Sequence, residues 1–273
     1  MPANDRERPL DRDQDLLRDA VRDAGALAVS MYGGDVEYWK KSNNTPVSAA
    51  DLAVDRLLKE RLADARPDYG WLSEETRDTV DRLSRERVWI VDPIDGTRAF
   101  LNRKPQWTIA VGLVEDGRPV LAVVFNPVTA EFFEAREGHG ALLNGEPIHV
   151  EDRDAIAGAR VIANAGVFSH RGWPRPWPGV STEFRISMAY RLCGVASGAY
   201  HATLSFSGKS DWDLAAADLL VREAGGVVTT RTGEPFRYNQ RETRHYSVLA
   251  AGPSLHRHFL QRTSGVTPWN RTS

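Results

Sequence analysis

Cysteine is almost absent from this sequence, because Cys193 is the only one in 273 residues. A disulfide framework within the chain needs at least two cysteines, and a cysteine-based zinc site also needs more than one. The seven histidines do not follow HExxH or a comparable zinc-binding spacing. The sequence therefore excludes a disulfide-stabilised fold and a cysteine-based zinc centre, and it fits a reducing compartment such as the cytoplasm.

Long apolar runs and a large charge of one sign are also missing. No apolar run reaches the length of a transmembrane helix, and the first residues, MPANDRERPLDRDQ, are too charged for a signal peptide. The formal net charge is -2, so no basic surface for nucleic acid or anionic lipid is indicated. We expect a cytoplasmic globular protein that has neither a nucleic-acid polymer nor a membrane as its partner.

The stretch RVWIVDPIDGTRAF, residues 87–100, is the most informative part of the chain. An apolar run typical of a buried strand ends at Asp92, and a helical turn after it would direct Asp92 and Asp95 toward one point. Gly96 lets the backbone approach a ligand closely, and the amide groups there and at Thr97 suit an anion. Because Mg²⁺ is normally held by one or two carboxylates plus a substrate phosphate, the pattern indicates a metal and phosphate site. The alternative is an ordinary turn, since Asp, Pro and Gly are common turn formers.

Three further carboxylates could belong to the same site, but each also has an interpretation that involves no metal or catalysis. Asp51 stands three residues after Ser48, which is the spacing of a capping box at a helix start, so helix capping explains it without chemistry. Glu74 lies in WLSEE, where adjacent glutamates are typical of a solvated surface. Asp213 falls in the first turn of a predicted helix, where its charge either complements the helix dipole or faces a metal.

The order of the predicted elements divides the chain into two parts. A helix is predicted over residues 13–31, and a polar, turn-rich loop over residues 39–46. We expect residues 1–150 to form helices followed by an antiparallel sheet that carries most of the metal ligands. Residues 151–273 are expected to form an α/β half that carries Asp213 and part of the substrate pocket.

Four segments, in this order, resemble the inositol monophosphatase superfamily of Mg²⁺-dependent, Li⁺-sensitive phosphatases: PVSAAD, WLSEE, WIVDPIDGTRAF and DWDLAAADLLVREAGG. The resemblance implies an α/β fold, a layered α/β/α/β/α sandwich of the inositol monophosphatase and fructose-bisphosphatase type. It also implies an enzyme that hydrolyses small phosphoric monoesters with metal-activated water and two to three Mg²⁺ ions. Several members of the superfamily form homodimers, so a homodimer is the assembly to test.

Matched residue by residue, the resemblance assigns roles to most of these positions. It implies that Thr97 and Asp51 orient and deprotonate the attacking water, and that Glu74 also lies beside a third, weaker metal. The implied metal ligands are Glu74, Asp92, the carbonyl oxygen of Ile94, Asp95 and Asp213. The implied substrate contacts are the amides of Gly96 and Thr97 and the side chains of Arg98 and Arg191.

The substrate is indicated by residues around these motifs. Inositol-specific members of the superfamily continue the signature as DGTTNF and bisphosphate nucleotidases as DGTKEF, whereas this chain has DGTRAF, in which Arg98 is basic. The segment KSNNTPVSAAD also resembles the KxDxSPVTxAD pattern of CysQ-type 3'(2'),5'-bisphosphate nucleotidases. Against this, the Gly-Ser pair that usually precedes the substrate-facing helix is Ile186-Ser187 here. Lys209, like Arg191, is a cation that either meets a second phosphate or lies on a solvated surface.

Hydrolysis of 3'-phosphoadenosine 5'-phosphate to AMP and phosphate is therefore our first prediction. The alternatives are an inositol-1-monophosphatase, a histidinol-phosphate phosphatase and a sugar 1,6-bisphosphatase. A hypothesis of another class is a catalytically silent scaffold that binds metal or phosphate. The silent scaffold would be expected to lack an essential carboxylate or Thr97, and all of them are present.

Overall fold

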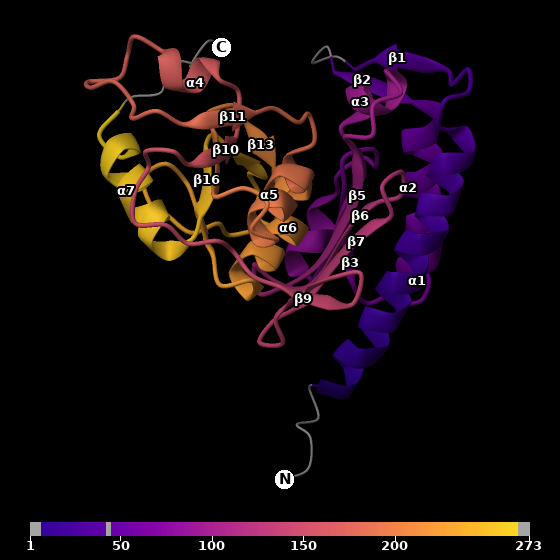
Figure 1. Cartoon of the computed structure of the whole chain (residues 1–273). Coiled ribbons are helices and arrows are strands. Elements are labelled where there is room, and N and C mark those ends of the chain that lie inside the picture. The colour runs from indigo at the N-terminus through magenta and orange to yellow at the C-terminus, as the bar shows by residue number, and fades with distance from the viewer. Residues whose placement is uncertain (1–6, 42–44, 267–273) are drawn as a thin grey trace.

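The computed structural model describes residues 7–41 and 45–266. Its main elements stack in five layers, which follow one another across Figure 1 from α1 to α7. Helices α1 and α2 cover one face of a seven-stranded sheet, and helices α5 and α6 lie between that sheet and a five-stranded one, whose far side is covered by α7. The expected α/β/α/β/α sandwich is thereby confirmed. The helices are α1 Glu7–Met31, α2 Ala49–Leu62, the 3₁₀ helix Val80–Ser84, α3 Thr97–Leu101, α4 Gly166–Ser169, α5 Met188–Ala196, α6 Asp211–Glu223 and α7 Pro253–Thr263.

The larger sheet is a meander that follows the chain order from β3 to β9. Only the pair β3 and β4 is parallel, and every other neighbouring pair is antiparallel. Strands β4, β5 and β6 are almost fully buried, because helices cover both faces, and this explains their nearly continuous apolar sequence. The strands are β3 Gly70–Ser73, β4 Arg87–Asp95, β5 Thr108–Glu115, β6 Arg118–Asn126, β7 Glu131–Arg136, β8 Ala141–Leu143 and β9 Glu146–Ile148.

The smaller sheet has the order β11, β10, β12, β16, β14 and mixes parallel and antiparallel pairs. Two short antiparallel pairs, β1 with β2 and β13 with β15, lie outside both sheets. The strands are β1 Tyr38–Lys40, β2 Pro46–Ser48, β10 Arg160–Ile162, β11 Ser181–Glu183, β12 Ala202–Ser205, β13 Lys209–Ser210, β14 Val227–Thr229, β15 Arg244–His245 and β16 Val248–Ala251.

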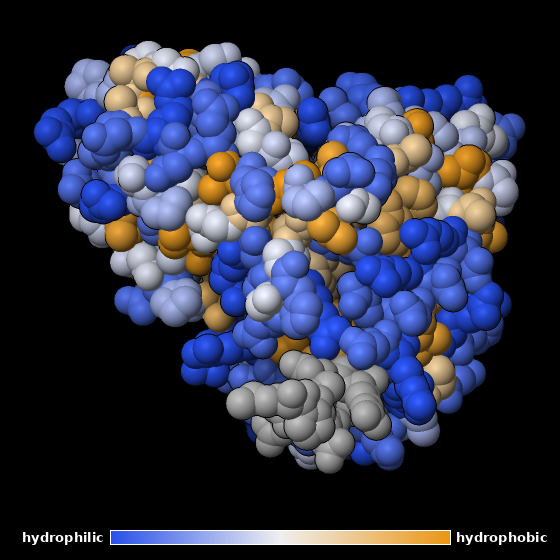
Figure 2. Space-filling model, turned by 60° about the horizontal axis from the view of Figure 1, so that its bottom comes forward, coloured by the Kyte–Doolittle hydropathy of each residue, from blue (hydrophilic) through white to orange (hydrophobic). Residues whose placement is uncertain are grey.

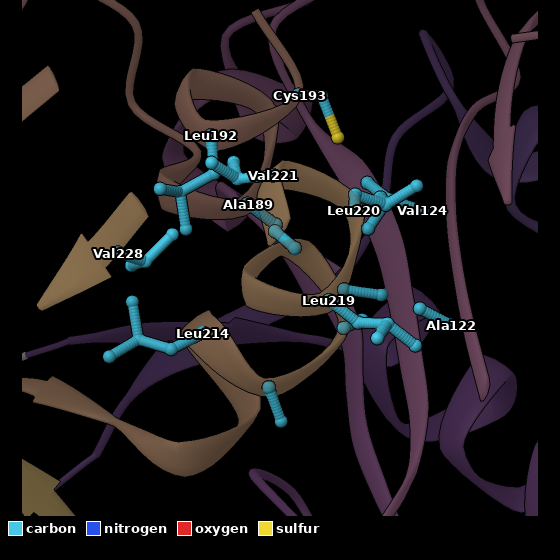
Figure 3. Close-up of a cluster of buried hydrophobic side chains, with 14 of the residues drawn as sticks. Ala122, Val124, Ala189, Leu192, Cys193, Leu214, Leu219, Leu220, Val221 and Val228 are labelled. Atoms are coloured by element: carbon cyan, nitrogen blue, oxygen red, sulfur yellow. The ribbon is translucent and has the colours of Figure 1, made fainter. Parts of the chain in front are cut away.

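The core between the two sheets is built on α6. Figure 3 shows Leu214, Leu219 and Leu220 of this helix among apolar side chains from α5, from strand β6 of the larger sheet and from Val228 of the smaller one. Cys193, the single cysteine, is fully buried in this cluster. Because α6 packs against both sheets, its N-terminal turn is held at a fixed place relative to strand β4.

Three sequence-based boundaries were wrong. Strand β4 does not end at Asp92, and no helical turn follows that residue. The strand continues to Asp95 with a shifted register against β5. Pro93 lies in this irregularity, where the missing N–H of a proline is tolerated. The residue range 39–46 is not all loop, because Trp39 pairs with Val47 between β1 and β2. Helix α1 begins at Glu7 rather than at residue 13.

The exposed large hydrophobic side chains of the described residues come from separate parts of the chain, such as Val29, Val80, Val128 and Tyr246. Figure 2 shows one face as mostly hydrophilic with scattered hydrophobic residues. Among the described residues, no helix combines the length and the apolar character that crossing a membrane requires.

Candidate active site

Three carboxylates come together where β4 ends and α6 begins. Each of Asp92, Asp95 and Asp213 offers an oxygen atom, and these oxygens all lie within 4.8 Å of one another. Asp92 and Asp95 belong to β4, while Asp213 lies 118 positions further along, in the first turn of α6. The packing of α6 against β4 and its neighbours therefore assembles the cluster. Carboxylate oxygens are the ligands that hard cations such as Mg²⁺ prefer.

The chain leaves β4 through a turn that requires glycine. Gly96 has a φ of 102°, in the left-handed region, and it caps the short helix α3. A side-chain carbon at this position would lie 3.0 Å from the carbonyl oxygen of Gln106 and 3.3 Å from the Cα of Trp107. A larger residue would therefore displace the backbone between Asp95 and Thr97.

Asp92 is an unsatisfied buried acid. Its side chain is 1% exposed, and Oδ1 has no hydrogen-bond partner. Burial is the main cause that raises the pKa of Asp92 well above its usual value, and the charges of Glu74, Asp95 and Asp213 raise it further. A buried carboxylate without a partner is costly unless a cation compensates it. This orphaned oxygen, within a set of oxygen ligands, fits a divalent metal.

Asp95 is better supported than Asp92. Its Oδ2 accepts hydrogen bonds from the Ser187 hydroxyl at 2.7 Å and from the Ala189 amide at 2.6 Å. Burial and the neighbouring charge of Asp213 nevertheless raise the pKa of Asp95 to about 7. Ser187 was not predicted as a site residue, although its position as the N-cap of α5 was a usable signal.

Glu74 joins the acidic cluster from the neighbouring strand. It directly follows β3, and its amide donates to the carbonyl oxygen of Val91 at 3.2 Å, so the parallel pairing places it beside Asp92. Lys41 Nζ lies 2.9 Å from Glu74 Oε1 and 2.8 Å from Glu75 Oε1. Burial above all raises the pKa of Glu75 to about 7. The expectation of a solvated pair is wrong, because the Glu75 side chain is only 4% exposed and that of Glu74 25%.

Asp51 serves two structural partners at once. One oxygen, Oδ2, accepts the Ser48 amide at 2.8 Å and completes the predicted capping box of α2. The other oxygen, Oδ1, accepts the hydroxyl of Thr97 at 2.8 Å. The same hydroxyl lies 3.3 Å from the carbonyl oxygen of Ile94, so the structure brings that carbonyl beside Thr97. Capping and a chemical role for Asp51 are therefore compatible.

Asp213 likewise caps its own helix. Its Oδ2 accepts the amide of Ser210 at 2.6 Å and completes a capping box that was not predicted from the sequence. The carboxylate also lies within the cluster that includes Asp92 and Asp95. The cap fixes the direction of the carboxylate, so it positions this group as well as stabilising α6.

A pocket of about 550 Å³ is linked to the acidic cluster by cations in its lining, although none of the clustered acids lines it. Its lining includes three cationic residues, Arg98, Arg191 and Lys209. The last two bear electrostatically on Asp95, which links the pocket to the carboxylates. A second pocket, of about 770 Å³, shares Arg98, but neither Arg191 nor Lys209 is part of its lining. The 550 Å³ pocket is therefore the one placed to hold a ligand that reaches the cluster.

Comparison with known proteins agrees with this geometry. The model of the inositol monophosphatase family matches residues 11–265. The chain is 37% identical over 236 residues to an inositol-1-monophosphatase of Rhizobium meliloti, covering 80% of this chain and 85% of that protein. It is 30% identical over 239 residues to a 3'(2'),5'-bisphosphate nucleotidase CysQ of Aggregatibacter actinomycetemcomitans, covering 84% and 89%.

A solved structure shares the fold as well. The extragenic suppressor protein suhB from Bartonella henselae superimposes with a TM-score of 0.80 at 25% identity, covering 92% of this chain and 98% of that one. The family match spans nearly the whole chain, and this family consists of phosphatases that use divalent metals. The predicted family, fold and enzyme class are confirmed: the chain is a phosphatase that belongs to the inositol monophosphatase family.

Proposed function

We propose that this phosphatase uses Mg²⁺ and hydrolyses 3'-phosphoadenosine 5'-phosphate to AMP and phosphate. The observation that carries the proposal is the position of a cation-lined pocket beside a cluster of carboxylates. Metal ions held by the carboxylate cluster would bind the phosphate that is cleaved. The cations of the pocket would bind a second phosphate, which remains on the product. A substrate with two phosphate groups uses both features.

The Mg²⁺ ions would be held by carboxylates and one backbone carbonyl. When bound, Mg²⁺ neutralises charge on the phosphate and lowers the pKa of a bound water. The buried, unpartnered oxygen of Asp92 supports this choice, since the site has an excess of negative charge without a cation. The proposed ligands are Glu74, Asp92, the carbonyl oxygen of Ile94, Asp95 and Asp213, with a third metal beside Glu74.

Asp51 and Thr97 would manage the proton of the attacking water. The single hydroxyl proton of Thr97 is donated to Asp51 Oδ1, so the lone pairs of Thr97 Oγ1 remain free to accept a proton from water. Burial is the main cause that raises the pKa of Asp51 above its usual value, which makes this carboxylate a stronger base. The proton would pass from water to Thr97 while the threonine proton moves to Asp51.

The rest of the substrate would lie in the 550 Å³ pocket. Arg191 is 6% exposed and points its charge into a space shared with Arg98 and Lys209. Guanidinium groups bind phosphate through paired hydrogen bonds, which favours a second phosphate at this place. The amides of Gly96 and Thr97 would contact the phosphate that is cleaved. The CysQ nucleotidases among the relatives support the same substrate class.

Inositol 1-phosphate is the second candidate substrate. It is favoured by the Rhizobium meliloti relative, an inositol-1-monophosphatase, which at 37% identity is more similar than the CysQ relative at 30%. The proposed metal ligands and the proton path would be the same for both substrates. Only the contacts in the pocket distinguish them.

The family relationship supports four further proposals. We expect inhibition by Li⁺, a cytoplasmic location and assembly as a homodimer. We also propose that residues 1–150 act as the metal-binding part, and residues 151–273 as the part that supplies Asp213 and the pocket.

Phosphate release in the presence of Mg²⁺ tests the proposed function. The substrates are 3'-phosphoadenosine 5'-phosphate, inositol 1-phosphate, histidinol phosphate and fructose 1,6-bisphosphate, and each assay is repeated with Asp95→Asn. Preference for the bisphosphate nucleotide, lost in the variant, is the expected result. Preference for inositol 1-phosphate would keep the chemistry and reject the substrate. No hydrolysis of any substrate by a folded protein would favour a silent scaffold.

A further inference from the structure

Arg191 is a buried cation that makes no direct ion pair with a carboxylate of the described residues, although the charges of Asp95 and Asp213 act on it. Its side chain is 6% exposed, and its one hydrogen bond within the described parts of the chain runs from Nε to the carbonyl oxygen of Arg185 at 2.6 Å. A buried guanidinium with most of its donors unused is costly, since its lost hydration is not replaced. Because Arg191 lines the 550 Å³ pocket, an anionic group of a ligand is the partner that its position calls for.

Phe184 lies directly against this guanidinium. The Cζ atom of Arg191 stands 4.5 Å from the centre of the Phe184 ring, a cation–π contact. The phenylalanine is nevertheless 49% exposed, and it lines the same pocket. Large apolar side chains tend to be buried, so a half-exposed ring in a pocket is a ready contact surface. The three other exposed aromatic residues of the described chain, Tyr38, Trp39 and Tyr246, do not line this pocket.

We propose that Phe184 is a stacking platform for a planar aromatic base of the ligand, with Arg191 fixing the ring and binding a phosphate of the same ligand. The inference rests on the function proposed above and adds the residue that selects the nucleotide. One part of the Phe184 ring is covered by the guanidinium, and the exposed part is available to a base. A saturated inositol ring carries hydroxyl groups around its edge and has no π-face to stack. The platform therefore favours a nucleotide over an inositol phosphate.

Equilibrium binding separates the base from the phosphate. AMP and ribose 5-phosphate carry the same phosphoribose, but only AMP has a base. With Mg²⁺ present, we expect the wild-type protein to bind AMP about tenfold or more tightly than ribose 5-phosphate, the usual size of a stacking contribution. Phe184→Ala and Phe184→Leu are expected to lose this preference, because neither residue has an aromatic ring. Phe184→Trp should retain it, and Tyr246→Ala, which changes an exposed aromatic outside the pocket, is the matched control.

Unchanged affinity for ribose 5-phosphate in each variant shows that the pocket is still folded. Equal affinity of the wild type for AMP and ribose 5-phosphate would overturn the proposal, and so would a preference that survives in Phe184→Ala. A preference that depends on Phe184 without hydrolysis of 3'-phosphoadenosine 5'-phosphate would leave the platform standing and reject the proposed reaction. If the protein hydrolyses that nucleotide but its preference for AMP over ribose 5-phosphate does not depend on Phe184, the proposed reaction stands and the stacking platform is rejected.

Discussion

The hydroxyl of Thr97 donates a hydrogen bond to Asp51 Oδ1 at 2.8 Å, which joins the start of α3 to the first turn of α2. The two residues are 46 positions apart, and the contact exists because α2 packs against β4. A threonine that gives its only proton to a buried carboxylate is oriented to accept one from water. In the proposed mechanism, Asp51 therefore acts through Thr97 rather than directly.

Replacement of Thr97 by alanine tests this proton path. We expect Thr97→Ala to lower kcat by about 10²-fold, a usual size for the loss of a general acid–base contribution. Thr97→Ser keeps the hydroxyl and is expected to keep most of the activity. The measurement is kcat at saturating Mg²⁺ for both variants. Equal losses in Thr97→Ala and Thr97→Ser would show that the methyl group, not the hydroxyl, matters.

Asp95→Asn is expected to raise the stability of the metal-free protein and to abolish its activity. Burial and the charge of Asp213 raise the pKa of Asp95 to about 7, so its charged form is unfavourable without metal. Removing that charge should raise the melting temperature of the chelator-treated protein at pH 8 by about 3 °C or more. Activity should disappear, since a proposed metal ligand is lost. A lower melting temperature than the wild type at pH 8 would contradict this account.

The metal-free wild-type protein should become less stable as the pH rises. The pKa of Asp95 rises from 3.8 to about 7 on folding, and that of Glu75 from 4.5 to about 7. Between about pH 4 and pH 7 the folded protein therefore holds more protons than the unfolded chain, and the free energy of unfolding falls as the pH increases. Thermal unfolding with chelator across pH 5 to 8 measures this fall.

Saturating Mg²⁺ is the control for the pH series. A bound cation compensates the charged form of Asp95, so the loss of stability toward pH 8 should be much smaller with the metal. The Asp95→Asn variant should show a weaker pH dependence than the wild type even in chelator. The same pH slope with and without Mg²⁺ would place the titrating groups elsewhere.

Local sequence patterns were sufficient for those parts of the site that depend on neighbouring residues. The capping box that holds Asp51 follows from spacing alone, and its hydrogen bond is present. The position of Asp213 in the first turn of a helix was also predicted. The path of β4 through Pro93 was not predictable, because the strand is held there by pairing with β5 that overrides the local turn signal.

Contacts between distant segments were equally out of reach. The Ser187 hydroxyl that supports Asp95 comes from 92 positions away. Lys41 reaches Glu75 from a segment that the sequence indicates only as a polar loop. No local pattern records such a contact, since it depends on how α5 and the β1–β2 pair pack against the larger sheet. The motifs identified the acids, and the fold determines their partners.

The proposed water attack predicts the stereochemistry of the reaction. No nucleophilic side chain is needed when water attacks the phosphorus in line with the leaving oxygen, so a single displacement should invert configuration. Hydrolysis of a phosphate ester made chiral with oxygen isotopes, in labelled water, measures this outcome. Retention would indicate two displacements and a phosphoenzyme, and it would reject the roles proposed for Asp51 and Thr97.

Lys41 is expected to compete with a divalent metal at Glu74. Its ammonium group lies 2.9 Å from Glu74 Oε1 and 2.8 Å from Glu75 Oε1. A metal cation that binds Glu74 is therefore repelled by the positive charge of Lys41. Lys41→Met removes that charge while keeping a long side chain, and it should lower the Mg²⁺ concentration needed for half-maximal binding several-fold, measured by calorimetry. Lys40→Met, which changes an adjacent exposed lysine, is the matched control. Weaker Mg²⁺ binding by Lys41→Met than by the control would contradict this prediction. It would mean that Lys41 holds the Glu74 carboxylate in position for the metal and does not compete with the metal for it.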